Sequence, residues 1–234
     1  NKKSLIIIPT YNEKRNISIL VNKIFHVMKK DFDILFIDDN SPDGTSFEIK
    51  KIQKVKKNIK LIIRSKKMGI GSAHKFGILY GYKKKYKIII TMDCDGTHDP
   101  KFLKKMLPKL KHSDLVTTNR FIKKNSLSSW PFYRKALTYF RHFIIKIFLN
   151  ISYDSSGAFR CYNTKTINNN DIILARDNGY SFFWESIFIF TKKNYKIAEI
   201  PITLPNRIAG GTKMRLRDIF FAFYYLIKIF IKNL

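Results

Sequence analysis

The sequence has few cysteines and lacks a long apolar run. Its two cysteines, Cys94 and Cys161, lie far apart without metal-ligand spacing, which excludes a cysteine-rich metal site and makes a reduced, cytosolic-side protein the expectation. Nothing near Asn1 resembles a signal peptide. No apolar run reaches the ~18 to 20 residues of a membrane span, because Lys228 interrupts the longest candidate, Ile219–Ile231.

Acidic residues are scarce as well. The chain has 17 Asp and Glu against 45 Lys and Arg, a net charge of +28. This excess implies an anionic partner, and nucleic acid, anionic lipid headgroups and a phosphorylated substrate all qualify; the lysines are spread over nearly every predicted helix, so about half of the charge is credited to compositional bias. With 45% hydrophobic residues, the 234-residue chain can bury one sizeable core, which excludes wholesale disorder.

Short apolar runs alternate with helical patterns through the first half of the chain. We expect strands at 4–9, 33–37, 60–63, from 88 onward and at 114–118, and helices at about 14–29, 46–56, 73–84 and 99–110. Strands that alternate with helices are typical of a parallel sheet covered on both faces. The first half therefore predicts a Rossmann-like nucleotide-binding unit in an α/β protein.

The pattern loosens after Arg120. A polar linker at 123–129 leads to a long helix at 130–151, and a similar helix closes the chain at 215–234. Between the two helices, 197–204 is predicted as a strand. Both helices mix aromatic and aliphatic residues with Lys and Arg, which suits either a membrane surface or packing against the core. The sequence alone leaves both readings open.

Two carboxylates follow the fourth predicted strand. Asp93 and Asp95 stand at the C-terminal end of the apolar run that begins at Ile88, and open α/β sheets bind ligands at that end. Carboxylates at i and i+2 suit a hard cation, Mg²⁺ or Mn²⁺, which fills its other positions with substrate phosphates and water. Alone, the Asp-x-Asp triplet at 93–95 is weak evidence for a metal site, since acidic residues after a strand are more often solvated turn residues.

Three other polar loops are expected beside this triplet. Residues 10–13, 38–45 and 119–120 each follow a predicted strand, and parallel connections put the C-termini of all strands at one edge. The first two loops offer hydrogen-bonding groups for a base and a ribose, while a cation on Asp95, with Asp93 behind it, would hold a pyrophosphate. The residues therefore predict a metal-dependent transferase acting on a nucleotide-activated substrate.

Four ordered motifs, at 8–13, 38–45, 92–100 and 154–160, resemble those of a known family. They are similar to the inverting family-2 glycosyltransferases, and most similar to the polyprenyl-phosphate sugar synthases, the group of the dolichyl-phosphate mannose synthases. The resemblance covers essentially the whole chain. It implies the GT-A fold, a Rossmann-like, mainly parallel sheet with helices on both faces, followed here by amphipathic C-terminal helices.

The resemblance also implies roles for individual residues. It implies nucleotide-sugar contacts from Pro9, Tyr11, Glu13, Asp38, Asp39, Asp93, Arg207 and Lys213. It implies a metal site at Asp93 and Asp95, an acceptor-phosphate site at Arg120, Arg134 and Thr138, and catalytic roles for Asp95, Arg120 and Arg134.

This chain departs from the family pattern at a few positions. Thr97 stands where relatives often have Gln or Ser, which leaves a third protein ligand of the metal open. Ala158 replaces a usual Gly and Phe183 a usual Gln, so sugar recognition near them is expected to differ. His98 is expected to support the site or to mark the start of the next helix, instead of binding the metal or acting as a base.

The expected enzyme is a hexosyltransferase at the cytoplasmic face of a membrane, moving mannose from GDP-mannose to a polyprenyl phosphate. A UDP-linked glucose or aminosugar donor and a saccharide acceptor stay open. A nucleic-acid-binding module is disfavoured, because the aromatic and basic residues gather in the two long helices.

The expected organisation is a catalytic domain at 1–214, with a nucleotide-sugar half at 1–121 and an acceptor half at 122–214, and a membrane-interface helix at 215–234. A membrane-anchoring subunit, or transmembrane segments after Leu234, is a further expectation that stays open.

Overall fold

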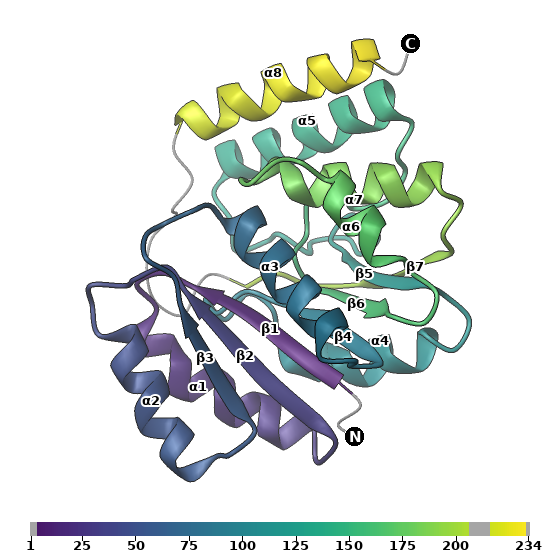
Figure 1. Cartoon of the computed structure of the whole chain (residues 1–234). Coiled ribbons are helices and arrows are strands. Elements are labelled where there is room, and N and C mark those ends of the chain that lie inside the picture. Colours follow the sequence, from purple (N-terminus) through teal and green to yellow (C-terminus); the bar gives the residue numbers. More distant parts are fainter. Residues whose placement is uncertain (1–3, 206–215, 233–234) are drawn as a thin grey trace.

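This computed structural model describes residues 4–205 and 216–232. At its centre lies a seven-stranded sheet (Figure 1). The strands, in chain order, are β1 Ser4–Thr10, β2 Phe32–Asp38, β3 Ile59–Ile63, β4 Ile88–Thr91, β5 Leu115–Asn119, β6 Arg160–Asn163 and β7 Ile197–Pro201. Their order across the sheet is β3-β2-β1-β4-β6-β5-β7.

The helices alternate with the strands in the first half and cluster in the second. They are α1 Lys14–Val27, α2 Thr45–Val55, α3 Ile70–Lys83, the 3₁₀ turn η1 Pro100–Phe102, α4 Leu103–Lys109, α5 Phe132–Leu149, α6 Asn169–Leu174, α7 Ser181–Lys192 and α8 Leu216–Lys232.

The predicted parallel sheet is confirmed for most of its strands. β1 pairs in parallel with β2 and β4, β2 pairs in parallel with β3, and β5 pairs in parallel with β7. β6 lies antiparallel between β4 and β5, so β4 and β5 still point the same way. The C-terminal ends of β1, β2, β4 and β5 therefore meet at one edge, as the motifs require.

Both faces of the sheet are covered, which is why its central strands read as continuous apolar runs. Along β1, Ile6 and Ile8 face a core shared with α1, α2 and α4, while Leu5 and Ile7 face the core of α3, α5, α6 and α7. All seven residues of β1 and of β2 are buried.

Helix α3 approaches the sheet closely because two of its residues are glycines. A Cβ at Gly77 would lie 2.5 Å from Ile7 Cγ2, and one at Gly81 would lie 2.6 Å from Ile89 Cδ1. His74 is buried on the same helix, one turn before Gly77. The sheet-facing side of α3 thus brings an imidazole against the ends of the strands.

Several predicted boundaries are wrong. The first helix ends at Val27 and not at 29, and the strand predicted at 197–204 ends at Pro201, after which Leu204 N donates to Ser126 O. The helix predicted from 99 begins as η1, where the Asp99 carboxylate accepts from Lys101 N. The helix predicted at 130–151 spans Phe132–Leu149, because Pro131 has an extended backbone and a proline disfavours helical geometry in the residue before it, Trp130.

Helices α5 and α8 lie side by side on the outer side of α7 (Figure 1). Phe148 of α5 meets Phe230 of α8 edge to face at 4.8 Å between ring centroids, and Leu226 of α8 is buried in the core. Among the described residues, none of the helices combines the length and the apolarity that crossing a membrane demands.

Candidate functional site

A cavity of about 410 Å³ opens at the edge where the parallel strands end. Its lining comes from the loops after β1, β2, β3, β4 and β5, from the start of α3, from the segment just before β6 and from α7 and α8. Seven of the predicted site residues line it: Pro9, Tyr11, Glu13, Asp39, Asp93, Asp95 and Arg120.

The other predicted site residues lie elsewhere. Asp38, Arg134 and Thr138 do not belong to the lining of this cavity. Arg207 and Lys213 lie outside the described residues.

The loop after β4 presents the two predicted metal ligands in different ways. Asp95 is buried, and its Oδ1 accepts from Thr97 Oγ1 at 2.6 Å and from Thr97 N at 3.1 Å. The Asp93 side chain is 35% exposed. Thr97 therefore orients Asp95 through its hydroxyl, a role that needs no direct contact with a metal.

Two histidines flank Asp93. His98 Nδ1 accepts a hydrogen bond of 2.9 Å from Asp93 N, and its ring stacks on Phe159. That bond makes Nδ1 an acceptor, so its 3.7 Å contact with Asp93 Oδ2 is not a hydrogen bond. The support role expected for His98 agrees with this geometry.

The second histidine, His74, is fully buried on α3 and was not singled out from the sequence. Its Nε2 lies 4.0 Å from Asp93 Oδ1, and its ring meets Phe183 edge to face. Burial, with smaller contributions from the charges of Arg160 and His98, lowers the pKa of His74 to about 3. The imidazole is therefore uncharged at neutral pH.

The adjacent acids after β2 have different surroundings. Asp38 is fully buried and accepts from Thr10 Oγ1 at 2.9 Å, Ser41 N at 2.9 Å, Ser41 Oγ at 2.6 Å and Ser46 Oγ at 2.6 Å. Asp38 thus organises the loop. Asp39 lines the cavity, and its carboxylate accepts from Arg64 Nε at 2.5 Å and Met68 N at 3.1 Å.

The loop after β1 contributes an aromatic ring and a carboxylate. Lys67 Nζ lies 4.6 Å from the centre of the Tyr11 ring, and both residues line the cavity. Glu13 Oε2 accepts from Asn16 Nδ2 at 2.6 Å. Lys67 and Arg64 follow β3, a position that the sequence reading did not connect with the site.

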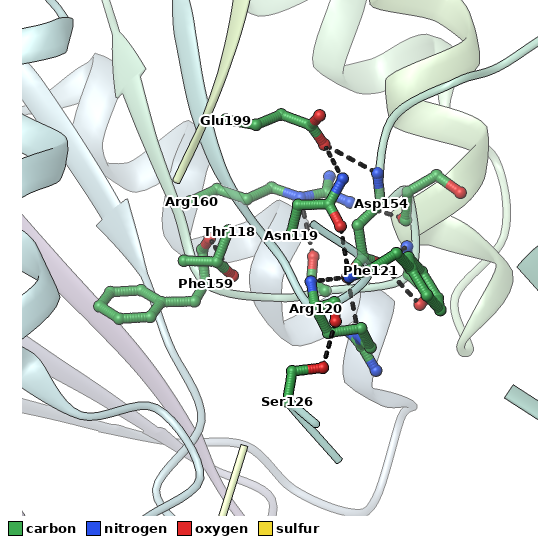
Figure 2. A network of polar contacts seen from close by, with 12 residues as sticks. Thr118, Asn119, Arg120, Phe121, Ser126, Asp154, Phe159, Arg160 and Glu199 are labelled. Atoms are coloured by element: carbon green, nitrogen blue, oxygen red, sulfur yellow. Dashed lines mark hydrogen bonds and ion pairs between the residues drawn. The ribbon is translucent and has the colours of Figure 1, made fainter. Parts of the chain in front are cut away.

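Arg120, a residue of the predicted acceptor site, lines the cavity directly after β5. Its Nε donates to Asp154 Oδ2 at 2.7 Å, and its backbone N donates to the same oxygen at 3.1 Å (Figure 2). Burial alone would raise the pKa of the Asp154 carboxyl, but the charge and hydrogen bonds of Arg120, with the charge of Arg141, hold that pKa below its usual value. Asp154 therefore stays ionised and fixes Arg120.

Further hydrogen bonds hold Asp154 itself in place (Figure 2). Glu199 Oε1, on β7, accepts from Asp154 N and from Asn119 Nδ2, both at 2.9 Å. Asn119 Oδ1 in turn accepts from Phe121 N at 2.6 Å. Strands β5 and β7 thus set the position of Arg120 from behind.

Helix α5 carries the remaining predicted acceptor residues. The Arg134 guanidinium lies 3.6 Å from the centre of the Trp130 ring, a cation–π contact, and Thr138 is buried. One turn further on, burial and the charge of Arg120 lower the pKa of Arg141 to about 10. Arg141 thus remains protonated at neutral pH.

The C-terminal helix takes part in the cavity, which the sequence reading did not predict. Arg217, Asp218 and Phe221 of α8 belong to the lining. One turn later, Tyr225 donates from its hydroxyl to Glu185 Oε1 of α7 at 2.8 Å. This hydrogen bond ties α8 to the protein beside the site.

The described side chains fit a divalent cation that shares its coordination with a substrate. Within residues 4–205 and 216–232, no three His, Cys, Asp or Glu residues are grouped to hold a metal. Asp93 and Asp95 bring two carboxylates, the hard oxygen donors that such a cation prefers, to the lining of the cavity. Mg²⁺ in proteins commonly takes one or two carboxylates and completes its shell with phosphates and water.

Comparison with protein families gives a match over most of the chain. The sequence profile described as glycosyl transferase family 2 matches residues 5–178. A polyprenol monophosphomannose synthase of Mycolicibacterium smegmatis is 27% identical over 216 residues, which cover 91% of this chain and 81% of that protein. An undecaprenyl-phosphate mannosyltransferase of Micrococcus luteus is 29% identical over 211 residues, which cover 90% and 86%.

Solved structures share the fold. Glucosyl-3-phosphoglycerate synthase from Mycobacterium tuberculosis, in complex with Mn²⁺, UDP-glucose and phosphoglyceric acid, superposes with a TM-score of 0.67 at 13% identity, covering 99% of this chain and 79% of that one. The same enzyme with Mg²⁺ and UDP gives a TM-score of 0.63 at 15% identity, covering 97% and 77%. The GT-A fold expected from the motifs is confirmed.

Proposed function

Because this chain belongs to glycosyl transferase family 2 and is a glycosyltransferase, we propose that it transfers mannose from GDP-mannose to a polyprenyl monophosphate. The observation that carries the proposal is that Asp93, Asp95 and Arg120 line one cavity. The names of the two relatives support it, because each name combines mannose with a polyprenyl carrier. We further propose 1–121 as the nucleotide-sugar half, 122–214 as the acceptor half and 215–234 as the interface helix.

The loops after β1, β2 and β4 bind the donor in this proposal. Pro9, Tyr11 and Glu13 contact the nucleotide, and Asp39, fixed by Arg64, accepts hydrogen bonds from it. Asp93 and Asp95 hold Mg²⁺ or Mn²⁺, which supplies positive charge for the diphosphate that leaves. Asp38 does not contact the donor itself, but its hydrogen bonds hold the loop that carries Asp39.

Arg120 receives the acceptor phosphate in this proposal. A lipid monophosphate has a second pKa near ~6 and is largely ionised at neutral pH, so its oxygen needs positioning more than a general base. A guanidinium suits this task because its N–H groups bind phosphate oxygens in a fork. Attack by that oxygen on the anomeric carbon, with departure of the nucleoside diphosphate, inverts the configuration.

Four other residues keep the roles that the family resemblance implies. Arg134 and Thr138 are proposed to approach the acceptor phosphate from α5. Arg207 and Lys213 are proposed to close over the donor.

The membrane surface is the proposed third partner, at its cytoplasmic face. Large apolar side chains are exposed along both outer helices: Phe132, Tyr133, Leu137, Tyr139, Phe140, Phe143 and Ile147 on α5, and Ile219, Phe220, Phe221, Phe223, Tyr224 and Ile231 on α8. Lys146, Lys228 and Lys232 lie on the same helices. Apolar rings beside basic residues suit an anionic bilayer surface that also carries the lipid acceptor.

A donor screen tests the proposal. Purified protein is incubated with polyprenyl phosphate in anionic vesicles, Mn²⁺ or Mg²⁺, and labelled GDP-mannose, UDP-glucose or a UDP-linked aminosugar. We expect label in the organic phase from GDP-mannose, none after chelation, and none from Asp95→Ala. Transfer from a UDP-sugar alone would replace the donor in the proposal, and no lipid-soluble product from any donor would refute the lipid acceptor.

A further inference from the structure

Several buried polar side chains of the described structure have no task in the proposed chemistry, and His74 is the one among them with two unpaired side-chain atoms. Its side chain is fully buried on α3, and neither ring nitrogen has a hydrogen-bond partner. An imidazole N–H buried without a partner costs free energy, and native proteins seldom leave such a group unpaired. A leucine or phenylalanine would fill this position on the sheet-facing side of α3 without that cost.

The ring is held rigidly and points one nitrogen at the cavity wall. Phe183 packs against it edge to face at 5.1 Å between ring centroids. Gly77, one turn along α3, lets the helix press against Ile7. In this position Nε2 lies 4.0 Å from Asp93 Oδ1, about 1 Å beyond hydrogen-bonding distance.

The two histidines beside Asp93 offer it opposite chemistry. His98 Nδ1 accepts from Asp93 N, so it presents no hydrogen to Asp93 Oδ2 at 3.7 Å. The His74 imidazole always carries a hydrogen on at least one of its two ring nitrogens. Nε2 faces a carboxylate oxygen, so the tautomer with hydrogen on Nε2 is favoured. Of the two rings, only that of His74 can donate to the Asp93 carboxylate.

We propose that His74 is a positioning residue for Asp93, with Nε2–H donating to Oδ1 when the carboxylate turns by about 1 Å. This bond leaves Oδ2 for a divalent cation, so the inference rests on the cation site of the proposed function. Ligands of bound metals are commonly oriented by such outer hydrogen bonds, whose removal lowers metal affinity about 10- to 100-fold. The imidazole does not belong to the lining of the cavity.

The test is the affinity for Mn²⁺ alone, measured from the electron paramagnetic resonance signal of the free ion, without any sugar donor. His74→Leu removes the donor and should weaken binding about 10-fold. His74→Gln can place an amide N–H near the Nε2 position and should restore affinity to within about 3-fold of the original protein. His112→Leu, at an exposed position after α4, is the matched control and should bind normally.

Each outcome has a definite consequence. Equal affinity of the His74→Leu variant and the original protein, with thermal unfolding showing that both are folded, would overturn the role of His74. A loss in both the Leu and the Gln variants would assign His74 to packing and would also overturn it. Absence of Mn²⁺ binding by the original protein would remove the cation site and the inference with it. Mn²⁺ binding that depends on His74 in a protein inactive with every donor would uphold the inference and refute the proposed substrates.

Discussion

The loops that follow the parallel strands and the pair of outer helices α5 and α8 are built in opposite ways. In the loops, acidic side chains are fixed by several partners each: Asp38 accepts four hydrogen bonds, and Asp39 accepts from Arg64 and Met68. The outer helices bury one stripe and expose most of their aromatic rings. The loops are thus fixed by hydrogen bonds, while the outer helices present a broad apolar surface.

The difference matches the ligands that we propose. A nucleoside diphosphate is a small polar molecule, and its recognition gains from groups already fixed in place. A polyprenyl chain in a bilayer is apolar and fluid, so area and charge matter more than fixed geometry. Arg120 stands between these regions, and its ion pair with Asp154 gives it the rigidity of the first.

The comparison is tested most severely at Asp95. If the loops form a fixed donor site, Asp95→Ala should lower transfer about 10³-fold by removing a charge-stabilising ligand. Thermal unfolding should change little. Asp99→Ala, a carboxylate four residues along that caps η1, serves as control and should retain most activity. Metal-dependent turnover by the Asp95 variant near the original rate would count decisively against this assignment.

The rigidity of Arg120 is tested by Asp154→Asn. This change keeps the shape but leaves a buried guanidinium without its partner, so we expect a loss of about 3 kcal/mol in the free energy of unfolding. The folded pKa of Asp154 is lowered, so its stabilising effect is complete above the unfolded value near ~3.9 and is lost as the pH falls through the folded pKa.

Urea titrations at several pH values measure this effect. The difference between the original protein and the variant should be constant from about pH 5 to 8 and shrink only in acid. A difference that already disappears near neutral pH would contradict the assigned ion pair.

A smaller effect is expected from Arg134→Ala on α5. If Arg134 approaches the acceptor phosphate, the KM for polyprenyl phosphate should rise about 10-fold, equivalent to ~1.4 kcal/mol, with the donor KM unchanged. Lys51→Ala, at an exposed position of α2, removes a surface cation far along the chain from α5 and is the control. Unchanged acceptor KM and rate in steady-state kinetics would reject the acceptor role of Arg134.

The smallest effect should come from single rings of the outer surface. Phe220→Ser on α8 should weaken binding to anionic vesicles about 5-fold, since one ring contributes roughly 1 kcal/mol at an interface. Phe47→Ser removes an equally exposed ring from α2, at 71% against 74%, and should leave vesicle binding unchanged. Equal losses in both variants, measured by vesicle sedimentation, would remove the distinction between the outer helices and the rest of the surface.

The parallel part of the fold could be predicted because its strands are buried on both faces and read as apolar runs. β6 could not, because it is four residues long and contains Arg160. That arginine is fully buried and donates to Ser186 Oγ and Phe183 O, partners on α7 that only the folded chain brings near. The local sequence pattern around β6 therefore does not predict these contacts.

The site shows the same limit at the scale of single residues. Asp38 and Asp39 are neighbours in one motif, and the resemblance assigns both to the nucleotide. Successive side chains along an extended segment point to opposite sides, so one is buried in the loop and the other faces the cavity. The helix α8 was predicted, but its part in the cavity and that of Arg64 were not, because their nearness to the cavity and to Asp39 depends on tertiary packing.

The reversed strand β6 has a consequence for how such a protein can diversify. β5 and β6 are antiparallel neighbours, with Thr117 beside Arg160, so residues 120–159 leave and rejoin the sheet at the same edge. This stretch, which contains α5, is topologically a detachable module. We expect that it can be exchanged between relatives, altering the molecule that is accepted, while the strands of the proposed donor half keep their register.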